Sequence, residues 1–143
     1  MYRHTQIGWV TIISIGLGIL LVGYYGDILS NWITLPVFGI LVICIIMFAS
    51  LTVTGDDSFI RIKFGPGLIR KSFPLEEIGS CNVVRNYWGY GWGIRKIPRG
   101  WLFNVSGLDA VELAMKDGKV YRIGTDEPRE LNEFIQWKLN EKK

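Results

Sequence analysis

The stretch WITLPVFGILVICIIMFASLTV, residues 32–53, decides how the rest of this chain is interpreted. Its 22 residues contain no charged side chain, and the polar segment Thr54-Gly55-Asp56-Asp57 follows at once. A helix of this length rises about 33 Å, which matches the roughly 30 Å thickness of the hydrocarbon layer of a bilayer. The sequence therefore predicts a membrane-spanning helix over residues 32–53 and a water-exposed part from residue 54.

A second uncharged stretch, Ile7 to Tyr25, precedes the first. Its 19 residues carry Trp9, Tyr24 and Tyr25 near their ends, where aromatic rings suit the headgroup boundary. A cleavable signal peptide is the alternative, because the basic residue Arg3 precedes an apolar run. The segment lacks a small-x-small cleavage site and another apolar stretch follows it closely, so we expect a retained spanning helix over residues 7–25.

The connection between the two predicted helices, residues 26–31, is short, so they are expected to form an antiparallel hairpin. It carries the acidic residue Asp27, whereas Arg3 lies at the other end of the hairpin. Four further basic residues follow at that end: Arg61, Lys63, Arg70 and Lys71. The positive-inside rule then predicts a multi-pass protein of the cell membrane with both termini in the cytoplasm.

The charges are unevenly distributed along the 143 residues. Only Arg3 and Asp27 precede residue 54, and the remaining 90 residues carry 15 basic and 12 acidic side chains. A segment of that size can bury a modest core of its own. We therefore expect two parts, a transmembrane helical hairpin over residues 1–53 and a cytoplasmic domain over residues 54–143.

From residue 58 onward, apolar and polar residues alternate with a period of two. Phe59–Phe64 and Leu68–Phe73 flank the turn Gly65-Pro66-Gly67, which predicts a β-hairpin. Further strands are expected at Cys81–Tyr87, Gly100–Val105, Asp109–Met115 and Lys119–Ile123. Strands spaced this closely predict an antiparallel meander rather than alternating strands and helices.

The end of the chain has a helical pattern instead. Thr125-Asp126-Glu127-Pro128 supplies capping side chains and a proline that fits a first helical turn. Leu131, Phe134 and Ile135 then recur at helical spacing. The predicted fold class is therefore α+β: a transmembrane hairpin followed by an antiparallel β-barrel or sandwich that a C-terminal helix closes.

Several short motifs resemble those of a known family, in the same order along the chain. They are Gly91-Trp92-Gly93-Ile94-Arg95, Arg99-Gly100-Trp101-Leu102-Phe103-Asn104-Val105-Ser106-Gly107, Ala110-Val111-Glu112-Leu113, Asp117-Gly118 and Ile123-Gly124-Thr125-Asp126-Glu127-Pro128. This series resembles small bacterial membrane proteins that carry a pleckstrin-homology-like (PH-like) domain behind two N-terminal transmembrane helices. The resemblance implies that fold and topology for essentially the whole chain, and it carries over no catalytic residue.

Aromatic, basic and glycine residues interleave from Arg85 to Phe103. The glycines at 89, 91 and 93 disfavour a regular buried strand, so we expect an exposed loop, where binding residues concentrate. The predicted site residues are Trp88, Tyr90, Trp92, Arg95, Lys96 and Arg99. Trp101 and Phe103 are expected to be core residues, and for Trp88 and Trp92 a core role beside a glycine bend stays open as an alternative.

These patterns favour a binding module over an enzyme. The only histidine, His4, lies in the N-terminal lead, and Cys81 therefore has no nearby histidine to activate it. No glycine-rich phosphate loop follows a strand and opens a helix. Cys44 and Cys81 fall in different predicted environments, so no disulfide, metal site or cofactor is expected.

The expected function is that of a membrane-attached PH-like scaffold that binds a protein partner or its own copies. Recognition of anionic lipid headgroups in the bilayer is the alternative, because residues 54–103 hold eight basic and four acidic side chains. A net charge of +3 is small for a nucleic-acid partner, so none is expected. Small residues at Ser14 and Gly18, and sheet edges that need protection, favour a homo-oligomer.

Overall fold

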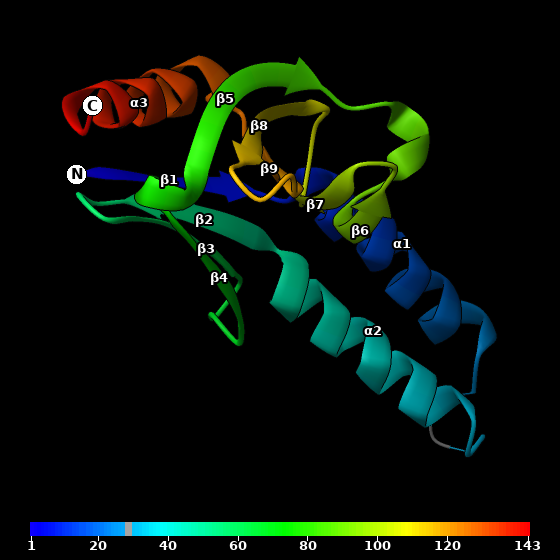
Figure 1. Cartoon of the computed structure of the whole chain (residues 1–143). Coiled ribbons are helices and arrows are strands. Elements are labelled where there is room, and N and C mark those ends of the chain that lie inside the picture. Colours follow the sequence, from blue (N-terminus) through cyan, green and yellow to red (C-terminus); the bar gives the residue numbers. More distant parts are fainter. Residues whose placement is uncertain (28–29) are drawn as a thin grey trace.

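The computed structural model of the chain describes residues 1–27 and 30–143. These residues form a mixed α+β structure with three α-helices and two β-sheets (Figure 1). The first sheet has the strand order β1-β2-β3-β4, and the second has the order β5-β8-β9-β7-β6.

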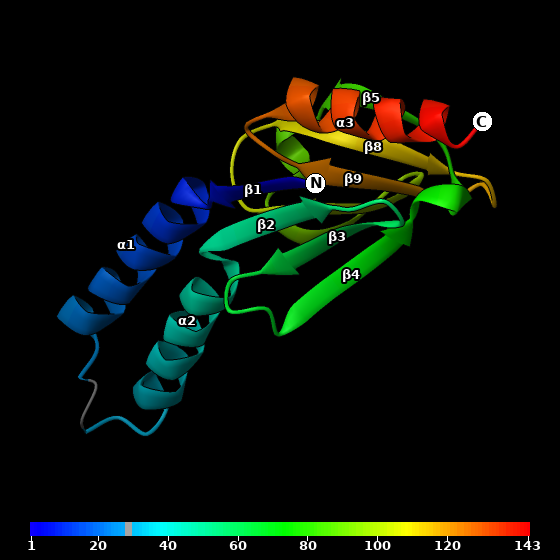
Figure 2. The same cartoon turned by 90° about the vertical axis from the view of Figure 1, so that its left-hand side faces the viewer.

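The elements follow one another in this order: β1 (Tyr2–Ile7), α1 (Trp9–Tyr25), α2 (Thr34–Phe48), β2 (Ser50–Gly55), β3 (Phe59–Phe64), β4 (Ile69–Pro74), the 3-10 turn η1 (Leu75–Glu77), β5 (Ile78–Arg85), the 3-10 turn η2 (Trp88–Tyr90), β6 (Gly93–Ile97), β7 (Gly100–Asn104), β8 (Asp109–Met115), β9 (Val120–Gly124) and α3 (Pro128–Glu141). The hairpin α1 and α2 lies to one side of the sheets (Figure 2).

The core forms where the two sheets and α3 meet. The alternating apolar residues of β3, Ile60, Ile62 and Phe64, are buried in it, as the period-two pattern predicts. The second sheet adds residues such as Leu113, and α3 adds its predicted stripe residues. The ring of Phe134 in α3 also lies 5.6 Å from the ring of Tyr2 in β1, so α3 contacts both sheets.

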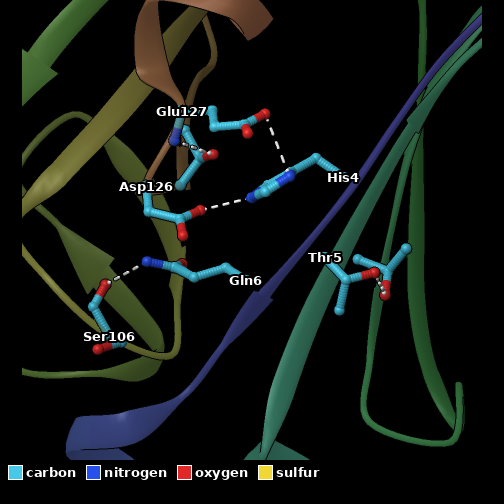
Figure 3. Close-up of polar contacts among 8 residues, drawn as sticks. His4, Thr5, Gln6, Ser106, Asp126 and Glu127 are labelled. Atoms are coloured by element: carbon cyan, nitrogen blue, oxygen red, sulfur yellow. Dashed lines mark hydrogen bonds and ion pairs between the residues drawn. The ribbon is translucent and has the colours of Figure 1, made fainter.

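Strand β1 ties the first sheet to the second through polar side chains (Figure 3). Nε2 of His4 lies 2.5 Å from a carboxylate oxygen of Asp126, and Nδ1 lies 3.1 Å from one of Glu127. Two residues after His4 in β1, the Gln6 side-chain amide donates to the Ser106 carbonyl over 3.0 Å. The N-terminal lead is therefore an integral strand, and the first sheet contains residues from both sides of the boundary expected at residue 54.

The expected membrane spans are wrong. Within the described residues, neither α1, with 17 residues, nor α2, with 15, is long and apolar enough to cross a membrane. At 1.5 Å per residue they rise about 26 and 23 Å, less than the roughly 30 Å of a hydrocarbon layer.

The ends of both apolar stretches belong to strands instead of helices. Ile7 ends β1, and Leu51 and Val53 lie in β2, where both are buried in the core. The transmembrane hairpin over residues 7–25 and 32–53 is thus corrected to two shorter helices. The multi-pass membrane localisation with cytoplasmic termini rested on those spans and is corrected with them.

The expected PH-like fold with a closed antiparallel barrel is wrong as well. Barrel closure requires every strand to pair on both sides, and in the part of the chain that the structure describes β1, β4, β5 and β6 each pair on one side only. The pairing is also not a simple antiparallel meander, because β7 runs parallel to β9. The fold is an α+β arrangement of two separate sheets, without a closed barrel among the described residues.

Helices α1 and α2 pack against each other and leave much of their apolar surface exposed. Neither helix contains a buried residue, and Leu20 is 69% exposed. The hairpin joins the sheets at its base, where the Thr11 hydroxyl donates to the Val105 carbonyl over 2.8 Å and the Phe48 ring lies 5.5 Å from the ring of Phe64.

Candidate functional site

Residues 86–92, which we term the aromatic loop, connect β5 to β6. These two strands lie at opposite edges of the second sheet, so the loop crosses the width of that sheet. It contains the turn η2 and four aromatic residues, Tyr87, Trp88, Tyr90 and Trp92. The loop expected from the glycine spacing is present, but it ends at residue 92, where the sequence predicted it to continue to about residue 99.

Hydrogen bonds fix both ends of the aromatic loop. At one end, the Asn86 N–H donates to the Leu108 carbonyl over 2.7 Å. At the other, the Trp92 indole N–H donates to the Gly107 carbonyl over 3.0 Å, and that carbonyl also accepts from the Asn104 amide over 2.9 Å. Gly107 has a φ of +70°, a conformation that glycine adopts without strain.

The rings between these ends project outward. Trp88 is 69% exposed and Tyr87 is 59% exposed. The Tyr87 ring lies 5.6 Å from Trp88 and 5.8 Å from Tyr90, so the three form a surface cluster. At Gly89 a Cβ would come within 2.5 Å of the Tyr87 ring, so the glycine lets this ring lie against the backbone. The loop presents an ordered aromatic surface.

The predicted basic residues do not share one surface. Arg95 joins the loop, because its Nε donates to the Trp92 carbonyl over 3.1 Å. Lys96 follows Arg95 in β6, so it points to the opposite face of the sheet, where it is paired with Trp101. Arg99 lies exposed in the turn from β6 to β7. The structure thus brings together Trp88, Tyr90, Trp92 and Arg95 and leaves Lys96 and Arg99 apart from them.

The two residues expected in the core differ from each other. Phe103 is buried, with its ring 6.4 Å from the rings of both Phe64 and Phe73. Trp101 is 43% exposed, so the expectation of a core residue does not describe it. Trp101 lies near the β6–β7 turn, two residues before Phe103. Its cross-strand partner is Lys96 in the edge strand β6.

Sequence reasoning missed a polar network next to the aromatic loop. Nε of Arg122 donates to the Glu112 carboxylate over 2.7 Å, and its Nη1 donates to the Asn86 side chain over 3.2 Å. Asn86 is 5% exposed, so the network holds the first residue of the loop in place. Glu112 and Arg122 are cross-strand partners in the β8–β9 hairpin. The tight turn Asp117-Gly118 fixes that register and could have revealed the pair.

Chemically reactive groups are few in the described part of the chain. No group of three or more His, Cys, Asp or Glu residues there could hold a metal ion. Burial raises the pKa of the Cys81 thiol to about 11, which keeps it protonated at neutral pH. Burial, and next the carboxylate of Glu127, raise the pKa of Tyr2.

Comparison with known proteins adds no relative. No protein-family model matches the chain, and no curated protein matches it. The resemblance to bacterial PH-like membrane proteins with two N-terminal transmembrane helices is therefore wrong. No family match supports it, and neither α1 nor α2 is long and apolar enough to cross a membrane.

Proposed function

We propose that this chain is a protein-binding module whose contact surface is the aromatic loop together with Arg95. One observation carries the proposal: the loop is hydrogen-bonded at both ends while Trp88, between them, is 69% exposed. A large ring gains from burial, so exposing it on an ordered support suits a surface that a partner covers.

The residue types support a protein partner. Tyr, Trp and Arg are enriched among the residues that contribute most to protein–protein binding. Because the loop is already held at both ends, less conformational entropy is lost when a partner orders it. The guanidinium of Arg95 beside the rings favours a partner with a carboxylate at the matching position.

The distribution of basic residues favours a protein over anionic lipid headgroups. A bilayer surface is nearly flat, and Arg95 and Lys96 point to opposite faces of β6. A flat surface that meets Arg95 and Trp88 therefore does not meet Lys96. Lipid recognition and self-association remain the alternatives to binding of a different protein, and the experiment below distinguishes the three.

The test places a photo-crosslinking amino acid at position 88 in the full chain inside cells. The matched control carries it at position 137, because Trp137 on α3 is another exposed tryptophan, at 56%. We expect one discrete crosslinked protein from position 88 and none from position 137, and we expect Arg95→Glu to reduce the yield about tenfold because it reverses the charge next to the rings.

Three other outcomes contradict the proposal. A crosslink at position 88 to a second copy of the chain would assign the surface to self-association. Binding of the purified chain to vesicles with anionic headgroups, lost in both Trp88→Ala and Arg95→Glu, would assign it to lipid. Equal crosslinking from positions 88 and 137 would leave the aromatic loop without any special role.

A further inference from the structure

Strand β5 carries the fewest charged residues of the edge strands in the described structure. The other edge strands, β1, β4 and β6, each carry two adjacent basic residues, counting histidine, which oppose pairing with another strand. These pairs are Arg3 and His4, Arg70 and Lys71, and Arg95 and Lys96. In β5 the single charged residue is Arg85, the last one, and the uncharged run Ser80–Val84 precedes it.

The hydrogen bonds show which backbone groups of β5 face outward. The N–H of Asn86 donates to Leu108, so the even-numbered positions from Ser80 onward face β8. The Cys81 carbonyl instead accepts from the Gln136 side chain of α3 over 3.4 Å, on the opposite side. Backbone direction alternates along a strand, and both polar groups of one residue face the same edge. The N–H and C=O of Cys81 and Val83 therefore point away from the sheet.

A groove of about 640 Å³ lies along this edge, between β5 and the C-terminal half of α3. In Figures 1 and 2 α3 lies alongside β5. Apolar side chains, among them Leu75, Ile78 and Leu139, line part of the groove, and Ser80 and Asn140 add polar atoms. The volume falls in the range of about 300–1,000 Å³ that ligand sites occupy.

The charged residues of the groove are mainly basic. Lys116, Lys142 and Lys143 line it, against one acidic residue, Glu76. The three lysines come from the β8–β9 turn and from the end of the chain, so they gather here only in the folded protein. This excess of positive charge is complementary to an acidic occupant.

From these observations we propose that the edge of β5 binds an extended acidic segment of a partner protein, which adds to the second sheet as a further strand and lies in the groove against α3. The outward backbone groups of Cys81 and Val83 would supply main-chain hydrogen bonds, and the lysines would select for carboxylates. The Gln136 side chain donates to the Cys81 carbonyl in this structure. An N–H of the incoming strand would replace it as the donor to that carbonyl. This site is separate from the aromatic loop and does not depend on the function proposed for it.

To test the proposal, a library of displayed random peptides is selected for binding to the full chain. The peptides have about ten residues, which is the upper length of common strands. We expect enriched peptides that alternate acidic with β-branched residues. Val83→Pro removes an outward N–H without removing a bond to β8, so we expect it to weaken binding about tenfold or more. Val83→Thr is the matched control, because it keeps the N–H and a β-branched side chain, and it should bind within about twofold of the original chain.

A second pair of variants tests the charge. Lys142→Glu should weaken the selected peptides about tenfold, whereas Arg129→Glu, the same charge reversal on α3 outside the groove, should leave binding unchanged. Bound peptide should also slow hydrogen exchange at the Val83 amide. Circular dichroism of each variant establishes that it is folded.

Several results would overturn the proposal. One is that no peptide is enriched, and another is that enriched peptides bind Val83→Pro as tightly as they bind the original chain. Apolar peptides that ignore Lys142→Glu would point to the exposed α1 and α2 surface. A dimer that Val83→Pro dissociates would show that a second copy, and not an acidic partner, covers the edge.

Discussion

Two groups of aromatic rings in this molecule have similar ring spacings and opposite exposure. In the core, Phe73 lies 4.9 Å from Tyr121 and is 1% exposed. In the aromatic loop, Tyr87 lies 5.6 Å from Trp88, which is 69% exposed. Contact between rings therefore does not by itself remove them from water.

The difference lies in where the neighbours come from. Phe73 belongs to β4 in the first sheet, and its partners Phe103 and Tyr121 belong to the second sheet, so two layers cover the rings. The rings of the loop come from residues 87–90 and contact mainly each other. Five measurements test how far this contrast between core and loop extends.

The largest effect is expected for Phe73→Ala in the core. Removing a fully buried phenylalanine leaves a cavity between the sheets, so the free energy of unfolding should fall by about 3–5 kcal/mol. Chemical denaturation measures it. A loss below about 1 kcal/mol would mean that the two sheets do not enclose this ring.

Gly124→Ala should have the next largest effect, about 1–3 kcal/mol. A Cβ at Gly124 would lie 2.1 Å from Oδ1 of Asn104, which is 1% exposed and therefore has little room to move. Because Asn104 holds the Gly107 carbonyl, Trp92 fluorescence should change as well. Gly39→Ala is the control: apart from its chain neighbours and the backbone of its own helix, no atom lies within 4 Å of the added Cβ, so stability should not fall.

Trp92→Ala should cost about 1–2 kcal/mol. The ring is half-buried and its indole makes one hydrogen bond, so the loss combines partial apolar burial with that bond. Trp92→Phe keeps most of the ring and should cost about half as much. Thermal melts of both variants measure the difference, and a loss as large as that of Phe73→Ala would place Trp92 with the core.

Trp88→Ala should change the free energy of unfolding by less than about 0.5 kcal/mol, because the ring has little burial to lose. Added in excess as a competitor, the original chain should reduce the crosslinked product formed from position 88, whereas the Trp88→Ala chain should leave that product unchanged. A substantial loss of stability would argue that Trp88 supports the loop and does not present a contact surface.

The last effect is absent at neutral pH. Burial raises the pKa of Cys81 from 9.0 to about 11, so above pH 9 the unfolded state releases a proton that the folded state retains. The free energy of unfolding should therefore fall as the pH rises from about 9 towards 11. Cys81→Ala should flatten this part of the profile. An identical slope in both proteins would contradict the burial of the thiol.

Local pattern alone located several elements. The strand predicted at Asp109–Met115 is confirmed, as is a helix following Glu127 with Leu131 and Ile135 buried. The period-two pattern of β3 also gave the correct buried face. In these cases the residues that set the conformation are neighbours in the chain, so periodicity and turn residues are sufficient.

The site was less accessible to sequence reasoning. Glycine spacing located the loop, but the short strand β6 at Gly93–Ile97 was missed, because Gly93 and two charged residues resemble a loop. Because this strand was not predicted, Arg95 and Lys96 were expected on one surface. Neighbouring residues of a strand point to opposite faces of the sheet. The groove beside β5 gave no local pattern, since its lysines come from separate segments.

The sequence by itself determined the mixed content of helix and strand, the apolar character of residues 7–25 and 32–53, and the turn and loop positions, because each depends on residues close together in the chain. Only the tertiary structure decided that Ile7 and Leu51 belong to strands, since pairing between β1 and β2 joins the two ends of the helical hairpin. That pairing shortens both helices. It also sets which edges remain open, and the free edge of β5 exists because long-range pairing placed β8 on its other side.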